Sequence, residues 1–240
     1  RAHITPGGKP LVFSAPFYTA PGGRKMGLGR ASSAERKKTI ALTASVMLGA
    51  LALAVDYTMK FTGAKDIIST PWRLTFPQLG FLKFDLDGVP LFCAMAFFGL
   101  TAGGIASVIL GLGIFARAPH IFGFVGGTMK ALAEFSTSIG AYLGLRSKWG
   151  RPSWASCVFL ALLTRVMVMM GANMVVLPLV YQVPVGVALG LLPFIALFNI
   201  IQGLITAVLG LSVAQAVARR AFHILPEDAP LLACLKEPPG

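Results

Sequence analysis

Long apolar runs separated by short polar stretches decide what this chain can fold into. The last run, Gly190 to Ala218, contains no charged residue and exceeds the roughly 20 apolar residues that a helix needs to cross a bilayer. Of the 240 residues, 55% are hydrophobic and only 12% are charged, against about 25% charged in soluble domains. The sequence therefore predicts an all-α, multi-pass membrane protein with one membrane domain.

Six helices are expected from the apolar runs and the polar residues between them. The run from Val89 to Ala116 would measure about 42 Å as one straight helix, which exceeds the hydrocarbon thickness of a bilayer. Gly99 offers a point at which this run can turn and form two shorter helices, and a single tilted helix is the alternative. The expected helices cover residues 38–61, 89–98, 101–115, 122–145, 152–181 and 187–218.

The membrane domain is expected over residues 37–220, between two cytoplasmic tails. The first tail, residues 1–36, is basic and rich in proline and glycine, and the second, residues 221–240, is polar, so both are expected to be disordered. The formal net charge of +12 comes largely from residues beside the apolar runs, where lysine and arginine set the topology. Nucleic-acid-binding motifs are absent from the sequence. We therefore expect six spans in the cell (plasma) membrane with both termini in the cytoplasm.

Residues 62–88 connect the first two expected helices and are too long for a tight turn. They contain Trp72, Phe76, Phe81 and Phe84, an aromatic content that a free linker does not need. Long ordered loops often serve as lids or binding loops. We expect this stretch, the lid segment, to fold over the outer end of the helix bundle.

Three amide side chains lie deep within the apolar runs and need partners there. Asn199 and Gln202 are three residues apart, so they share one helix face, and Asn173 lies toward the outer end of the preceding run. An unpaired amide in hydrocarbon costs several kcal/mol. These side chains are therefore expected to face the bundle interior, where they either bond a neighbouring helix or bind a ligand.

Charged and small residues inside the runs give further expectations. Lys130 and Glu134 are four residues apart and are expected to form an ion pair that faces the interior. Asp56 is expected at the membrane interface. The first helix also has a face of small residues suited to close helix contact, formed by Ala41, Ser45 and Gly49.

The sequence has no motif for catalysis, ATP binding or metal binding. GxxxxGK[ST], HExxH and GxSxG are absent, and the three cysteines and three histidines are scattered. Asp85 and Asp87, in DLDG, resemble part of the aspartate-rich motif of membrane CDP-alcohol transferases, whose companion aspartates are missing downstream. We expect neither an enzyme nor a metal site, and a membrane scaffold or enzyme without transport function is the alternative.

Three segments, in this order, resemble the substrate-binding S-components of energy-coupling factor (ECF) vitamin transporters, above all the riboflavin-specific branch. The first, Phe81 to Phe92, is similar to the family's Lys-x-Asp and Asp-x-Pro stretch at the end of the first outer loop. The second begins at Asn173 and ends in Leu-Pro, as in the family. The third runs from Leu192 to Gly203 and is similar to the family's Pro-Phe-Asn-x-x-Lys-Gly pattern.

The resemblance implies a six-helix protein that captures a vitamin outside the cell and docks on a transmembrane coupling protein with two ATPase subunits. Those subunits would use ATP, and this chain would need no cofactor of its own. In the family, small residues on the first helix contact the coupling protein, which assigns that role to Ala41, Ser45 and Gly49. The implied substrate-binding residues are Asn173, Asn199 and Gln202 at the polar edge of a flavin ring, with Leu79, Gly80, Phe81, Lys83 and Asp85 in the lid segment.

The sequence departs from the family pattern at two places. Gln202 stands where the family has lysine, so this side chain can donate and accept a hydrogen bond but carries no charge. An insertion places the residues from Phe194 to Phe198 where the family has one phenylalanine directly before its asparagine. A related flavin or another vitamin of similar size is therefore an open alternative to riboflavin.

Overall fold

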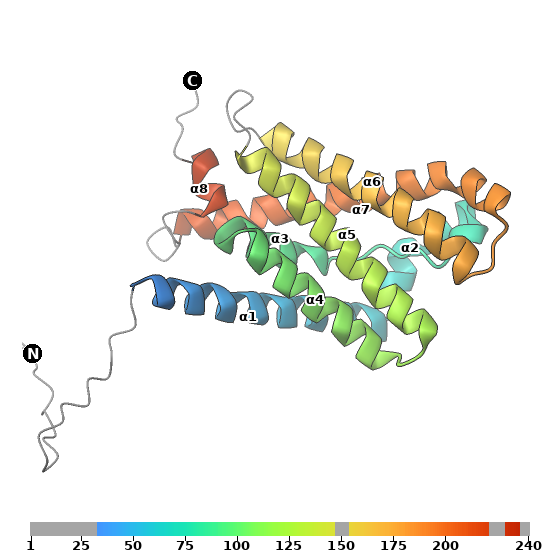
Figure 1. The fold of residues 1–240 in the computed structure, drawn as a ribbon, viewed down its shortest axis with the longest axis horizontal. Helices are drawn as coiled ribbons and strands as arrows, with labels where there is room; N and C mark the ends of the chain where they lie inside the picture. Colours follow the sequence, from blue (N-terminus) through green and yellow to red (C-terminus); the bar gives the residue numbers. More distant parts are fainter. Residues whose placement is uncertain (1–32, 147–153, 221–228, 236–240) are drawn as a thin grey trace, which may run out of the picture.

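The computed structural model describes residues 33–146, 154–220 and 229–235. The described residues form helices and short connections and contain no strand, which confirms the all-α class. Figure 1 shows the long helices side by side in one bundle. The helices are α1 (Ser33–Phe61), α2 (Ala64–Thr75), η1 (Pro77–Leu79, a 3-10 helix), α3 (Gly88–Phe98), α4 (Leu100–Arg117), α5 (Ile121–Arg146), α6 (Trp154–Leu179), α7 (Val185–Arg220) and α8 (Pro230–Leu235).

A helix occupies each of the six ranges expected from the apolar runs, namely α1 and α3 to α7. Four of them, α1, α4, α6 and α7, are long and apolar enough to cross a membrane. Helix α3 has only 11 residues, and the 26-residue α5 carries Lys130 and Glu134. The six-span topology and the cytoplasmic termini therefore stay predictions.

The expected tails are only partly described. Residues 1–32, expected to be disordered, lie outside the described residues. The second tail contains the short helix α8, in which Leu231 and Leu232 are buried. Leu231 packs in the core cluster that α3, α5, α6 and α7 build, so this part of the tail is attached to the bundle.

Gly99 divides the long apolar run into α3 and α4, as its position in the sequence predicts. Its φ angle is +89° and its ψ angle is −179°, a backbone conformation open to glycine and costly for other residues. Because the chain turns there, α3 and α4 pack as separate helices against α1.

The lid segment, expected as an irregular loop, contains the 12-residue helix α2. Trp72 and Leu79 are 6% and 1% exposed, and they pack in one cluster with Ile195 and Phe198 of α7. Figure 1 shows α2 at the end of the bundle opposite the start of α1, near the α4–α5 and α6–α7 connections. We call this the lid end.

Two of the three residues of the small-residue face of α1, Ser45 and Gly49, are turned into the bundle, and Ala41 is half-buried. Ser45 is 1% exposed and Gly49 is buried. A Cβ atom at Gly49 would lie 3.1 Å from the Cα atom of Ala106 in α4. The expected coupling-protein contact through Ser45 and Gly49 therefore does not fit this arrangement, because α4 already covers that face. The exposed side of α1 carries Ala50 and Ala54 instead.

Candidate functional site

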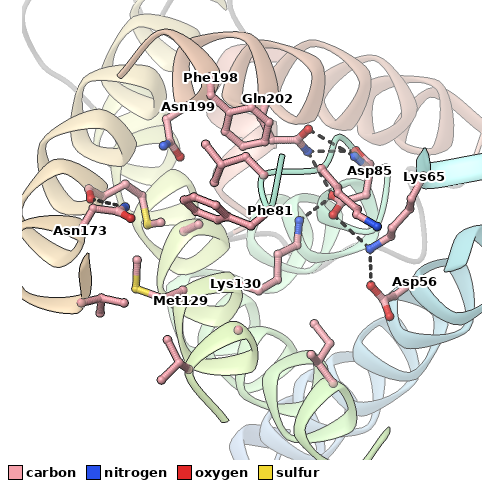
Figure 2. Close-up of a pocket in the computed structure, with 18 of the residues that line it drawn as sticks. Asp56, Lys65, Phe81, Asp85, Met129, Lys130, Asn173, Phe198, Asn199 and Gln202 are labelled. Carbon is pink, nitrogen blue, oxygen red and sulfur yellow. Dashed lines mark hydrogen bonds and ion pairs between the residues drawn. The ribbon is translucent and has the colours of Figure 1, made fainter. Parts of the chain in front are cut away.

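A cavity of about 300 Å³ lies at the lid end, between five of the helices and the lid segment (Figure 2). Its wall combines apolar side chains, three amides and several charged groups. Helices α1, α4, α5, α6 and α7 all contribute lining residues, so the cavity depends on the whole bundle. The lining residues include Asp56, Lys65, Phe81, Lys83, Asp85, Met129, Lys130, Arg165, Met169, Asn173, Tyr181, Phe198, Asn199 and Gln202.

The two asparagines expected at a ligand both line this cavity and are almost fully buried. Asn173 of α6 is 3% exposed, and its Nδ2 donates to the Met169 carbonyl at 2.8 Å. Asn199 of α7 is 2% exposed, and its Nδ2 donates to the Ile195 carbonyl at 2.9 Å. Each amide is thus held by the backbone of its own helix and keeps hydrogen-bonding capacity for the cavity.

Gln202 also lines the cavity, but its amide is bonded to the lid segment. Its Nε2 donates to the Asp85 carbonyl at 2.9 Å and to Asp85 Oδ1 at 3.1 Å, and its Oε1 accepts from the Asp85 backbone N–H at 3.3 Å. Figure 2 shows this pairing. Gln202 therefore attaches the lid segment to the middle of α7.

Three of the five lid residues expected at a ligand line the cavity, namely Phe81, Lys83 and Asp85. Leu79 is buried in the cluster that attaches the lid segment to α7, and Gly80 is not among the lining residues. The difference arises because η1 turns Leu79 toward α7, where its apolar side chain is removed from water.

Three exposed aromatic rings pack together at the lid end, and two of them, Phe81 and Tyr181, line the cavity. Phe81 stacks on Tyr181, with ring centroids 5.6 Å apart and an interplanar angle of 24°, and Tyr181 contacts Phe122 at 5.7 Å. All three side chains are between 37% and 52% exposed. They come from the lid segment, the α6–α7 connection and the start of α5, so these three parts of the chain meet here.

Beside the cavity, charged side chains form one continuous network. Lys130 Nζ lies 2.5 Å from Asp85 Oδ1, 2.8 Å from Asp87 Oδ1 and 3.1 Å from Glu134 Oε1. Four acidic and four basic groups balance one another, which offsets the high cost of burying isolated charges. In order of contact, the network runs Arg117, Asp56, Lys65, Asp85 with Asp87, Lys130, Glu134 and Arg165.

Three carboxylates of this network have the spacing of metal ligands. One oxygen each of Asp85, Asp87 and Glu134 lie within 4.8 Å of one another. The Lys130 ammonium group contacts all three residues. It takes the place that a cation would occupy, so this donor set does not fit a metal in the described arrangement.

The network includes residues whose role the sequence does not reveal. Asp56, expected at the membrane interface, is 1% exposed and pairs with Lys65 and Arg117. Arg165, in the middle of α6, is 2% exposed and pairs with Glu134 at 3.0 Å. In the sequence, each of these residues is a charged residue inside or at the end of an apolar run. Such a position predicts a buried partner but does not identify it.

A second ion pair lies within the lid segment, outside this network. Lys83 Nζ is 2.5 Å from Asp66 Oδ1. The hydrogen bond from Lys83 lowers the pKa of the Asp66 carboxyl group. Stability from this pair is therefore complete above the ordinary aspartate pKa of about 3.9 and is lost only as the pH falls further. The Asp66 carboxylate of the pair therefore stays charged at neutral pH.

The fold can be compared with known structures. No protein-family model matches the chain, and no curated protein sequence matches it. The matching solved structures include that of the S component of a bacterial ECF transporter, with a TM-score of 0.54 and 22% sequence identity. The match covers 78% of this chain and 98% of that one. The chain therefore has the fold of an ECF transporter S component.

Proposed function

We propose that this protein is the substrate-binding membrane subunit of an ECF-type importer and that it captures riboflavin or a related flavin. The observation that carries the proposal is the cavity at the lid end, which has buried asparagines on one side and the lid segment on another. The cavity is within the size range of small-molecule sites, about 300–1,000 Å³.

The chemistry of the wall suits a planar ring with a polar edge. Met129, Met169 and Phe198 offer apolar contacts for the ring faces, and methionine sulfur adapts well to aromatic surfaces. Asn173 and Asn199 offer hydrogen bonds for the edge. A non-transport scaffold predicts instead that the amides bond one another and leave no cavity. Among the described residues, the two asparagines and Gln202 bond other groups.

Transport would require a separate energising module, because the sequence has no P-loop. We propose that a transmembrane coupling protein and two ATPase subunits supply it. The exposed side of α1, with Ala50 and Ala54, offers a surface for a close helix contact in the membrane. The predicted topology places the lid end outside the cell, where the substrate is captured.

An absorption spectrum of the purified, detergent-solubilised protein tests the proposal. Retention of the visible bands of an oxidised flavin would support both the ligand class and the cavity. A colourless protein that also leaves the fluorescence of added riboflavin unquenched would reject the flavin assignment. Another vitamin would then be the candidate substrate, with Gln202 as the first residue to explain the difference.

A further inference from the structure

Arg165 is the one lining residue that joins the charged network to a cavity asparagine among the described residues. Its Nη1 donates to Glu134 Oε1 and to Thr137 Oγ1, both at 3.0 Å. Its Nε donates to Asn199 Oδ1 at 3.3 Å. The guanidinium group is planar, so the ion pair with Glu134 also fixes the direction of the Nε–H bond.

Two contacts fix the orientation of the Asn199 amide. Oδ1 accepts from Arg165 Nε, and Nδ2 donates to the Ile195 carbonyl. Rotating the amide by half a turn would place Oδ1 against the Ile195 carbonyl oxygen and Nδ2 against the Arg165 Nε–H group. An amide nitrogen has two hydrogens, so Asn199 keeps one N–H donor after these bonds.

Asn173 is held to its own helix in the same way, but its carbonyl oxygen is left free by the part of the chain that the structure describes. Its Nδ2 donates to the Met169 carbonyl, and its Oδ1 has no hydrogen-bond partner within the described ranges 33–146, 154–220 and 229–235. The cavity therefore presents the remaining N–H donor of Asn199 from α7, and from α6 the carbonyl oxygen of Asn173 together with its remaining N–H. A lactam group, with a carbonyl oxygen next to a ring N–H, has the complementary pair.

We infer that Arg165 is a positioning residue for substrate recognition: it holds Asn199 so that the amide N–H is offered to a carbonyl oxygen of a lactam-bearing ring. The inference rests on the proposed function, since it describes the same cavity. It also gives the buried charge of Arg165 a role beyond its ion pair with Glu134.

Riboflavin fluorescence-quenching titrations test this inference in a double-mutant cycle. Arg165→Lys keeps the charge beside Glu134 but removes the planar donor, and we expect the Kd to rise about tenfold. Asn199→Ala should raise the Kd at least as much, and the double variant no further than Asn199→Ala alone. Thr137→Val removes a different Arg165 contact and should change the Kd less than about twofold. A Kd of the double variant that rises by the product of the two single-variant factors would show independent effects and would overturn the inference.

The polarity of Asn199 has its own test. Asn199→Asp keeps an oxygen for Arg165 but replaces the N–H donor by an acceptor, so it should bind riboflavin as weakly as Asn199→Ala. Binding as tight as wild type would overturn the inference. If the wild type binds no riboflavin, the proposed function fails. The thermal-unfolding midpoints of the same variants then decide whether Arg165 and Asn199 are coupled. A double-variant decrease smaller than the sum of the single decreases supports the Arg165–Asn199 coupling, and an additive decrease overturns it.

Discussion

At the scale of single residues, Asn173 separates a binding role from a structural one. Its one hydrogen bond among the described residues goes to its own helix backbone, so Asn173→Ala should leave the thermal midpoint nearly unchanged. The same change should weaken riboflavin binding about tenfold, the effect of losing one hydrogen bond. Fluorescence titration measures this, with Met174→Leu, which does not line the cavity, as the control. Unchanged affinity with a lowered midpoint would show a structural role.

Two aspartates of the lid segment should respond very differently to the same substitution. Asp85 is 5% exposed and contacts Lys130, Lys65 and Gln202. Asp85→Asn leaves buried cations unbalanced and should cost about 3–5 kcal/mol of unfolding free energy. The Asp66 side chain is 41% exposed, so Asp66→Asn should cost at most about 1 kcal/mol. Thermal unfolding in detergent compares the stabilities of the two variants. Equal losses of unfolding free energy would contradict the buried network around Asp85.

Sequence reasoning located polar residues inside apolar runs but not their partners. The cost of an amide or charge in hydrocarbon singled out Asn173 and the Lys130–Glu134 pair, and the latter is confirmed at 3.1 Å. It could not predict that Asp85 and Asp87 join Lys130, because these contacts span more than 40 positions and depend on how the lid segment folds. Spacing rules cover neighbours on one helix and not contacts between elements.

At the scale of elements, the break at Gly99 gives a prediction with an internal control. Gly99 has φ +89°, so Gly99→Ala should cost about 1–3 kcal/mol. Gly171 lies within α6, and a Cβ atom added there would meet only open space. Gly171→Ala should therefore stabilise the protein by up to about 1 kcal/mol through helix propensity. Thermal unfolding measures both, and a neutral Gly99→Ala would contradict the strained turn.

Helix α2 is the element that the sequence did not reveal. Its 12 residues include an internal proline, Pro71, and mix polar with apolar side chains, which favours an irregular loop when the packing partner is unknown. Packing against the bundle favours the helical conformation of this segment, because it buries Trp72 against Phe198 of α7 at a centroid distance of 5.4 Å. The length and aromatic content of the segment predict that it packs on the bundle, as Trp72 does, but they do not predict its helical conformation.

At the scale of the whole molecule, the bundle is held together by both apolar packing and a balanced set of charges. The network joins α1, α4, α5, α6 and the lid segment, and Gln202 adds α7. This arrangement fixes the cavity from every side. Hydropathy predicts the helices, because each must satisfy its own backbone hydrogen bonds in lipid, but it carries no information on which charged residues meet.

The most direct test of the account is a riboflavin titration of the purified protein, followed by fluorescence quenching. We predict saturable binding of flavin to the wild type and loss of that binding in the variant with Asn173→Ala and Asn199→Ala combined. Gln215→Ala, which removes an amide of α7 away from the cavity, should bind as the wild type does. Absence of binding to the wild type, or equal binding by the double variant, would contradict the claim that the cavity at the lid end holds a flavin.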